Sequence, residues 1–390
     1  MSIKRKPKHV YTPPANGFPE WNNNPDIFEV NRLPAHASFT PYANAEEALV
    51  GERNVSRRVK SLNGSWKFAF APNPASRQTD FYKDDYDCGD WKEIAVPGHW
   101  QLQGYDYPQY VNIRYPWSER EDIAPPFAPT EYNPVGSYVT SFTVPRGWDG
   151  DPVILSFQGV ESAFYVWVNG EFVGYSEDTF TPAEFDITAY LRDGDNKLAV
   201  EVYRWCDASW LEDQDFWRLS GIFRDVFLVS KPPVHLYDFF VRTDLDDVYR
   251  DARFSVEATI ANYDDADLAQ YALVAKLYAP DGRVAFERKR PVAAETLTIE
   301  ERMIDPEKWS AERPALYTLV LSLLKGETEV EAAKCKVGFR KFELKDGLMQ
   351  LNGKRIVFHG VNRHEFSCET GRALGKEDMV RDILLMKSHN

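Results

Sequence analysis

The feature that most constrains the fold is a period of two in hydrophobicity, repeated along most of the chain. In the stretch AFYVWVNGEFVGYS, Phe164, Val166 and Val168 alternate with other side chains up to Asn169 and Gly170. This alternation is typical of a half-buried strand, and an Asn-Gly pair favours the positive φ angles of a type I′ hairpin turn. Similar strands recur about every ten residues without long helical patterns, which predicts a mainly β protein built from sandwiches.

Changes in this rhythm predict four regions. Residues 1–45 are rich in Pro and Asn and are expected to form an extended arm. Residues 46–232 have the short strands of a jelly-roll β-sandwich. The proline-marked stretch KPPVHL ends this region, and the regular strands of residues 233–340 predict an immunoglobulin-like β-sandwich. Residues 341–390 differ from both sandwiches.

The last region combines one hairpin with one strand and one helix. Asn352 and Gly353 mark the hairpin turn, an apolar strand is expected over residues 356–358, and GKEDMVRDILLMKSHN has helical spacing. Acidic residues lie in the first turn of that helix, where the helix dipole favours them. Three such elements cannot close a hydrophobic core, so we expect this region to be the beginning of a larger domain.

Composition excludes several classes of partner. The chain has 46 basic and 60 acidic residues, a net charge of −14, which argues against nucleic acid or an anionic membrane as the main partner. No run approaches the length of a membrane span, and the basic start KRKPKH is not followed by the apolar stretch of a secretory signal. The four cysteines are widely spaced, which fits reduced thiols in a cytoplasmic protein.

The stretch WLEDQDFWRLSGIFRDV places Glu212, Asp213 and Asp215 between bulky aromatic residues. Two interpretations are open from these residues alone. In one, the acids belong to a salt-bridged turn in which Asp215 pairs with Arg218 or Arg224. In the other, they form a sugar site, because a sugar needs polar groups for its hydroxyls and flat rings for its C–H faces.

Eight segments of the chain are distinctive, and they follow one another in a fixed order. They are NRLPAHASFTPY, SLNGSWKFAFAP, VPGHWQLQGYDYPQYVNIRYPW, PPFAPTEYNPVGSY, VWVNGEFVGYSED, WLEDQDFWRLSGIFRDV, GVNRHEF and DILLMK. Together they resemble the N-terminal part of a bacterial β-galactosidase of glycoside hydrolase family two. The resemblance implies a jelly-roll sugar-binding domain, an immunoglobulin-like domain and then a (β/α)₈ barrel that carries the chemistry. A barrel needs about 200 residues or more, so only its first βα unit would lie here, and we expect a truncated or partial sequence.

The resemblance assigns expected roles to three residues. Asp215 matches the aspartate of the family that ligates a sodium ion and meets the galactose. Asn112, in YVNIRYPW, matches an asparagine that hydrogen-bonds the galactosyl hydroxyls, although a turn residue with no ligand would explain it as well. His364, in GVNRHE, matches a substrate-contacting histidine at the end of the first barrel strand; a histidine held by neighbouring backbone is the alternative.

The catalytic groups are expected outside these residues. The acid/base and nucleophilic glutamates of the family, and its magnesium ligands, fall beyond Asn390 in the matching order. Glu365 follows His364, but the catalytic role in the family belongs to other glutamates. The full-length protein is therefore expected to hydrolyse terminal β-D-galactose residues, as in lactose, with retention and as a homo-oligomer, whereas the 390 residues alone are expected to be inactive.

Two alternatives remain open. One is a carbohydrate-binding module with no catalysis, built from the jelly roll and the immunoglobulin-like domain. The other is a related β-glucuronidase or β-mannosidase. The pairing of LEDQDFWR with VNIRYPW favours galactose as the sugar, since likeness of fold alone does not fix a substrate.

Overall fold

A computed structural model describes residues 5, 7, 8, 21–118, 120–213 and 215–390. Most of the predicted N-terminal arm before residue 21 therefore lies outside the described residues. The chain forms two compact units. The jelly-roll unit contains the described residues within 6–35, 61–229 and 362–390, and the immunoglobulin-like unit contains those within 1–5, 36–60 and 230–361.

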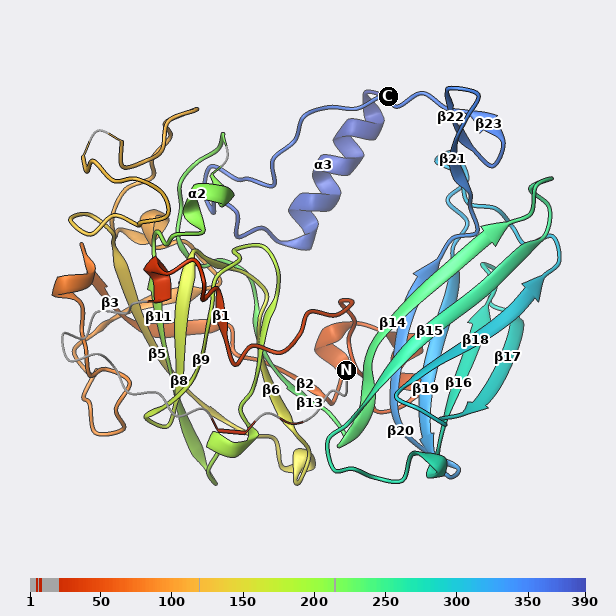
Figure 1. Cartoon of the computed structure of the whole chain (residues 1–390), viewed down its shortest axis with the longest axis horizontal. Helices are drawn as coiled ribbons and strands as arrows, with labels where there is room; N and C mark the ends of the chain where they lie inside the picture. Colours follow the sequence, from red (N-terminus) through yellow and green to blue (C-terminus); the bar gives the residue numbers. More distant parts are fainter. Residues whose placement is uncertain (1–4, 6, 9–20, 119, 214) are drawn as a thin grey trace. The chain divides into compact units, whose positions relative to one another are not determined.

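Two sheets make up most of the jelly-roll unit (Figure 1). The larger sheet has the order β1-β9-β8-β11-β5-β3-β4, and the smaller has the order β10-β6-β13-β2. Strands β7 and β12 form a separate pair. The strands are β1 (Glu29–Val30), β2 (Val59–Ser61), β3 (Gly64–Ala71), β4 (Lys92–Val96), β5 (Val135–Thr143), β6 (Val153–Phe157), β7 (Val160–Glu161), β8 (Ala163–Val168), β9 (Glu171–Ser176), β10 (Ala183–Asp186), β11 (Asp195–Tyr203), β12 (Gly221–Ile222) and β13 (Val226–Ser230).

The Asn-Gly hairpin predicted from the sequence is confirmed. Strands β8 and β9 pair antiparallel, and Asn169 and Gly170 between them have φ angles of 52° and 80°. Phe164, Val166 and Val168 face the smaller sheet, where they pack in one cluster with side chains of β6 and β13. Burying these side chains between the two sheets stabilises the sandwich by about 1.5–3 kcal/mol each.

The opposite face of the larger sheet is also buried. Tyr165, Trp167 and Tyr175 point away from the smaller sheet, yet each is at most 7% exposed. Trp21 stacks on Tyr165, with ring centroids 5.7 Å apart, and Phe81 covers Trp167 at 5.8 Å. Much of the aromatic content of the chain therefore forms a second core under long loops.

The immunoglobulin-like unit is a second sandwich. Its two main sheets have the orders β14-β15-β18 and β17-β16-β19-β20, and a small sheet has the order β21-β22-β23. One apolar cluster, which includes Phe254, Leu273 and Leu319, lies between the main sheets. The strands are β14 (Val234–Leu245), β15 (Ala252–Asn262), β16 (Tyr271–Tyr278), β17 (Val284–Pro291), β18 (Thr296–Met303), β19 (Tyr317–Lys325), β20 (Thr328–Val337), β21 (Phe342–Lys345), β22 (Leu348–Leu351) and β23 (Lys354–Arg355).

Helices are few and short. Three α-helices occur in the described parts of the chain: α1 (Ala45–Val50), α2 (Ser209–Glu212) and α3 (Lys376–Ser388). Among the described residues, no helix has the length and apolar character that crossing a bilayer would require. The remaining helical turns are η1 (Trp21–Asn23), η2 (Arg53–Val55), η3 (Pro74–Ser76), η4 (Trp100–Gln103), η5 (Arg146–Trp148), η6 (Thr188–Tyr190) and η7 (Leu268–Gln270).

The predicted helix near the C-terminus is confirmed as α3, but the predicted strand before it is wrong. Residues 356–358 have no regular secondary structure, and the side chains of Val357 and Phe358 are 63% and 68% exposed. A strand requires a hydrogen-bonding neighbour along its length. Among the described residues, Ile356 makes only the single backbone bond from its N–H to Met349 O, at 3.0 Å.

Replacing Gly136 by alanine is expected to destabilise the jelly-roll unit by about 1–3 kcal/mol, because the added methyl group overfills a packed site. A Cβ at this position on β5 would lie 2.7 Å from the Trp100 ring and 2.8 Å from the Phe68 ring. Urea unfolding followed by tryptophan fluorescence measures the change, since all tryptophans except Trp309 lie in this unit.

Gly147→Ala is the matched control. Gly147 is exposed, and no atom lies within 4 Å of the Cβ that would be added there. Its unfolding midpoint should therefore stay near that of the wild type. Equal effects of the two substitutions would contradict tight packing around β5.

Candidate functional site

Two loops of the jelly-roll unit are tied together by a backbone bridge. The N–H of Arg218 donates to Gln109 O at 2.7 Å. Beside this bridge, the hydroxyl of Tyr110 donates to Asp215 Oδ1 at 2.6 Å, and the Tyr110 ring lies 5.7 Å from that of Trp217. The stretches YVNIRYPW and WLEDQDFW, which are about 100 positions apart in the sequence, are therefore neighbours in space.

The segment around His364 lies against one of these two loops. The His364 ring lies 6.2 Å from that of Phe216, and the Phe366 ring stacks on Trp217 at 6.4 Å with an angle of 13° between the planes. All three predicted site residues thus come from loops that touch one another within one compact unit. Their contact with a sugar stays a prediction.

Asp215 does not form the ion pair that the alternative interpretation requires. Arg218 pairs with Asp213 instead, at 2.5 Å, and Arg224 donates to the carbonyl oxygen of Phe180 at 2.9 Å. The Asp215 side chain is exposed, and Arg218 acts on it only through a longer-range charge interaction. Its carboxylate retains free acceptor capacity beside the Tyr110 hydroxyl, which is what a cation or a sugar hydroxyl needs.

The other two acids of this stretch are engaged in holding the turn. Glu212 accepts from the backbone N–H of Thr179 at 2.8 Å and from its hydroxyl at 2.7 Å. Burial raises the pKa of Glu212, and these two bonds oppose that rise. Burial likewise raises the pKa of Asp213, and the Arg218 charge opposes it. Glu212 is thus tied to Thr179 and Asp213 to Arg218, so neither acid is free for a ligand.

The two tryptophans of this stretch differ in role. The indole N–H of Trp210 donates to Phe127 O at 2.9 Å, and the Trp210 ring packs edge-on against Tyr115 and Trp117. Trp210 is therefore a packing residue. Trp217 keeps 42% of its surface exposed next to Asp215 and can offer a ring face to a ligand.

Asn112 lies in an exposed turn, two residues after Tyr110. Its φ angle is 53°, a left-handed conformation that asparagine tolerates better than most residues. The N–H of Arg114 donates to Val111 O at 3.1 Å and closes this turn. The backbone alone therefore explains an asparagine here, while the exposed amide is also available to a ligand.

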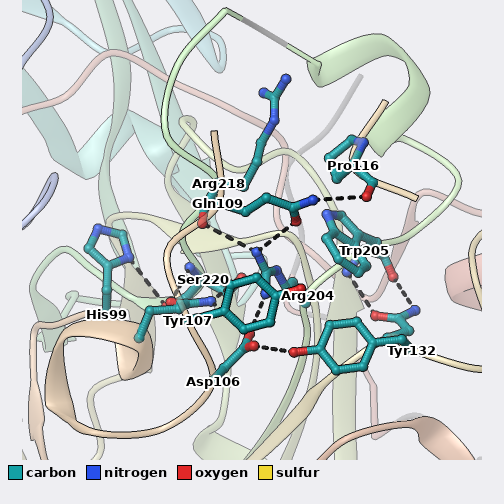
Figure 2. Close-up of polar contacts among 12 residues, drawn as sticks. His99, Asp106, Tyr107, Gln109, Pro116, Tyr132, Arg204, Trp205, Arg218 and Ser220 are labelled. Carbon is teal, nitrogen blue, oxygen red and sulfur yellow. Dashed lines mark hydrogen bonds and ion pairs between the residues drawn. The ribbon is translucent and has the colours of Figure 1, made fainter. Parts of the chain in front are cut away.

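A buried ion pair lies beneath the backbone bridge (Figure 2). The Arg204 and Asp106 side chains are 1% and 0% exposed and are in direct contact. Arg204 also donates to the Gln109 side chain at 3.5 Å and to Arg218 O at 3.4 Å, so it reaches both strands of the bridge. Tyr132 donates its hydroxyl to Asp106 from the other side. Burial lowers the pKa of Arg204, and the Asp106 charge opposes that change.

One set of potential metal ligands occurs among the described residues. Oxygen or sulfur atoms of Glu177, Cys206 and Asp207 lie within 4.8 Å of one another, and all three residues are buried. Burial raises the pKa of Glu177 to about 9, and it also raises the pKa of Asp207 and that of Cys206. Glu177 and Cys206 therefore hold protons near neutral pH, and a cation would have to displace these protons. Asp215 is not part of this cluster.

The sequence alone does not reveal this cluster, because its members follow different strands. Glu177 comes directly after β9, whereas Cys206 and Asp207 follow β11. Both strands are antiparallel to β8, which lies between them, so they end at the same edge of the sheet. Only the strand order brings these side chains together.

Comparison with known proteins places this architecture in a family. Residues 59–232 match the sugar binding domain of glycosyl hydrolases family 2, residues 234–340 match a second domain of that family, and residues 342–390 match its TIM barrel domain. The solved structure of a Bacteroides uniformis β-glucuronidase is similar with a TM-score of 0.70 and 26% identity, over 85% of this chain and 38% of that one. The chain belongs to glycosyl hydrolase family 2.

Two curated relatives with higher identity carry the same name. A β-galactosidase of Priestia megaterium is 56% identical over 100% of this chain and 38% of its own length. A β-galactosidase of Halalkalibacterium halodurans is 50% identical over 95% of this chain and 36% of its own length. The chain therefore spans a little over a third of the length of these relatives.

Replacing Asp106 by alanine is expected to destabilise the jelly-roll unit by about 3–5 kcal/mol, because it leaves the buried Arg204 charge unpaired. Asp84→Ala is the matched control: Asp84 pairs with Arg192 at 2.7 Å, but both side chains are about half exposed, so its loss should cost less than about 1 kcal/mol. Urea unfolding followed by tryptophan fluorescence measures both. Similar values for the two variants would contradict a structural role for the buried pair.

Glu177→Gln is expected to change how stability depends on pH. Because burial raises the pKa of Glu177 from 4.5 to about 9, the folded chain keeps a proton that the unfolded chain releases above pH 4.5. The contribution of Glu177 to the free energy of unfolding is therefore fully present below pH 4.5. It declines as the pH rises towards 9, by up to about 1.4 kcal/mol per pH unit. Glutamine removes this decline, and unfolding at pH 5, 7 and 9 with a chelator present measures it.

The control for this experiment is Glu171→Gln, which removes a half-exposed carboxylate from the start of β9. Its unfolding free energy should run parallel to that of the wild type across the pH range. A Glu177→Gln variant that also runs parallel would show that the carboxyl titrates in the ordinary range.

Proposed function

We propose that this chain is the substrate-binding front part of a β-galactosidase, which as a complete protein hydrolyses terminal β-D-galactose residues with retention. The observation that carries the proposal is the match of 95–100% of the chain, at 50–56% identity, to β-galactosidases. The geometry supports it, because the exposed Asp215 carboxylate, the Tyr110 hydroxyl and the Trp217 ring form one polar and aromatic face. Such a face suits a sugar with hydroxyls on one side and C–H groups on the other.

In this proposal the jelly-roll unit binds the sugar and does not cleave it. Retaining hydrolysis uses two carboxylates about 5 Å apart. We assign these groups, and the magnesium ligands, to the part of the complete protein that lies outside these 390 residues. Glu365 has no assigned role in catalysis; it lies 3.5 Å from Arg363 in an exposed ion pair.

Asp215 is proposed to ligate sodium and to meet the galactose, with Asn112 and His364 as further sugar contacts. A sodium ion prefers oxygen ligands, and the Asp215 carboxylate is exposed and is not neutralised by a close arginine. The buried cluster at Glu177 is a separate place where a cation could bind. The complete protein is further proposed to be cytoplasmic and to assemble into a homo-oligomer.

A β-glucuronidase is the second candidate, since the solved structure from Bacteroides uniformis has that name and a TM-score of 0.70. Its 26% identity is half that of the galactosidases, which favours galactose. The complete gene product should hydrolyse nitrophenyl β-galactoside at least about a hundredfold faster than the glucuronide, by kcat/KM, because a pocket built for one polar group leaves groups unpaired with the other sugar. The reverse order would overturn the substrate assignment.

Asp215→Ala in the complete gene product is expected to raise KM for nitrophenyl β-galactoside by about tenfold or more and to abolish the effect of sodium on the rate, because a cation ligand is lost. Rates with sodium chloride and with choline chloride, at equal ionic strength, measure the sodium effect. Asp193→Ala removes an exposed carboxylate from the turn before β11 and should leave both quantities unchanged. Persistent sodium dependence in the Asp215 variant would refute the assignment.

A further inference from the structure

The segment after Phe366 approaches two loops of the jelly-roll unit very closely. Ser367 and Gly371 pair across a tight turn, with N–O distances of 2.8 and 2.9 Å. Gly371 has a φ angle of 64°, and a Cβ there would lie 2.6 Å from Leu219 and 2.7 Å from His99. Only glycine permits this approach, and it places the next residue, Arg372, among the loops of the candidate site.

The backbone of Arg372 is anchored on a neutral histidine. Its N–H donates to His99 Nε2 at 3.1 Å, and the other ring nitrogen of His99 lies 3.3 Å from Ser220 O. Burial, together with the Arg372 charge, lowers the pKa of His99 to about 3. The ring is therefore uncharged, with its proton on Nδ1 for Ser220 and a lone pair on Nε2 for Arg372.

The guanidinium of Arg372 then makes three kinds of contact at once. Nη1 donates to Trp217 O at 3.0 Å, and Nη2 contacts the Glu161 carboxylate. The face of the group lies over the Phe216 ring, 4.7 Å from its centroid. A planar group with donors on several edges suits this arrangement, whereas a lysine ammonium could meet only part of it.

We infer that Arg372 is a positioning residue that holds the turn of Asp215, Phe216 and Trp217 in place for the galactoside. Its bond to Trp217 O and its contact with the Phe216 ring engage the side of the turn that faces the protein. The Asp215 carboxylate and the Trp217 ring remain on the exposed side, where they meet Tyr110. Loss of the arginine frees the backbone that carries both ligand-facing groups.

This inference rests on the proposed function, because the effect of displacing the turn of Asp215, Phe216 and Trp217 is measured by the kinetics of galactoside hydrolysis. Arg372→Gln in the complete gene product should raise both KM for nitrophenyl β-galactoside and the sodium concentration for half-maximal rate by about tenfold, the usual effect of removing a group that orients a ligand. Arg372→Lys, which keeps the charge for Glu161, should recover most of the melting temperature but not the KM.

The matched control is Arg224→Gln. Arg224 lies over Phe223 in the same aromatic cluster, and its guanidinium donates to Phe180 O at 2.9 Å and to Gln158 O at 3.5 Å, so it does not hold the Asp215 turn. Its loss should lower the melting temperature while KM and the sodium requirement stay at wild-type values. Equal kinetic changes in both variants, or unchanged kinetics in Arg372→Gln, would overturn the inference.

A spectroscopic measurement tests the positioning without catalysis. In protein labelled with 5-fluorotryptophan, the Trp217 resonance is assigned by its absence in Trp217→Phe. Arg372→Gln should shift or broaden this resonance, and Arg224→Gln should leave it in place. An unmoved Trp217 resonance in Arg372→Gln overturns the inference. A wild-type protein that hydrolyses no galactoside overturns the proposed function instead. In that case the Trp217 resonance still tests whether Arg372 positions the turn.

Discussion

The buried ion pair of Arg204 and Asp106 is the contact on which the candidate site depends. Arg204 follows directly after β11, so the large sheet fixes its position. From there it donates to the Gln109 side chain and to Arg218 O, the two residues whose backbones form the bridge between the site loops. A charge that is 1% exposed is costly without its partner, so the loop that supplies Asp106 must close over the sheet for the fold to be stable.

That requirement explains why acids and aromatic rings are crowded together between residues 210 and 218. Glu212 and Asp213 are each committed to a partner, Thr179 and Arg218 respectively. Asp215 is the acid left facing outwards. The Arg218 guanidinium, the partner of Asp213, lies over the Phe216 ring, 5.4 Å from its centroid.

The arrangement of strands could be predicted in large part from the sequence. Alternating residues such as Phe164, Val166 and Val168 identified a hairpin because a strand pointing its side chains to opposite faces leaves that pattern. The pattern could not show that Tyr165 and Trp167 are buried as well, since their cover comes from Trp21 and other residues far away in the sequence. The strand expected at 356–358 was wrong for a related reason, as its apolar run says nothing about a partner.

For the candidate site, too, the sequence could predict some features and not others. Asp215, Asn112 and His364 could be selected by their motifs, but no spacing relates them, because their proximity depends on the Gln109–Arg218 bridge and on ring contacts between loops. The cluster of Glu177, Cys206 and Asp207 left no signal in the sequence, since only the order of strands in the sheet brings it together.

By itself, therefore, the sequence determined the class of fold and the position of hairpin turns, and it indicated candidate residues for a sugar site, because these follow from local pattern and side-chain chemistry. The tertiary structure alone decided which acid stays exposed, which tryptophan packs against other rings and where Arg372 inserts. Those outcomes depend on burial and on hydrogen bonds between segments that are distant along the chain, as between Arg372 and Trp217.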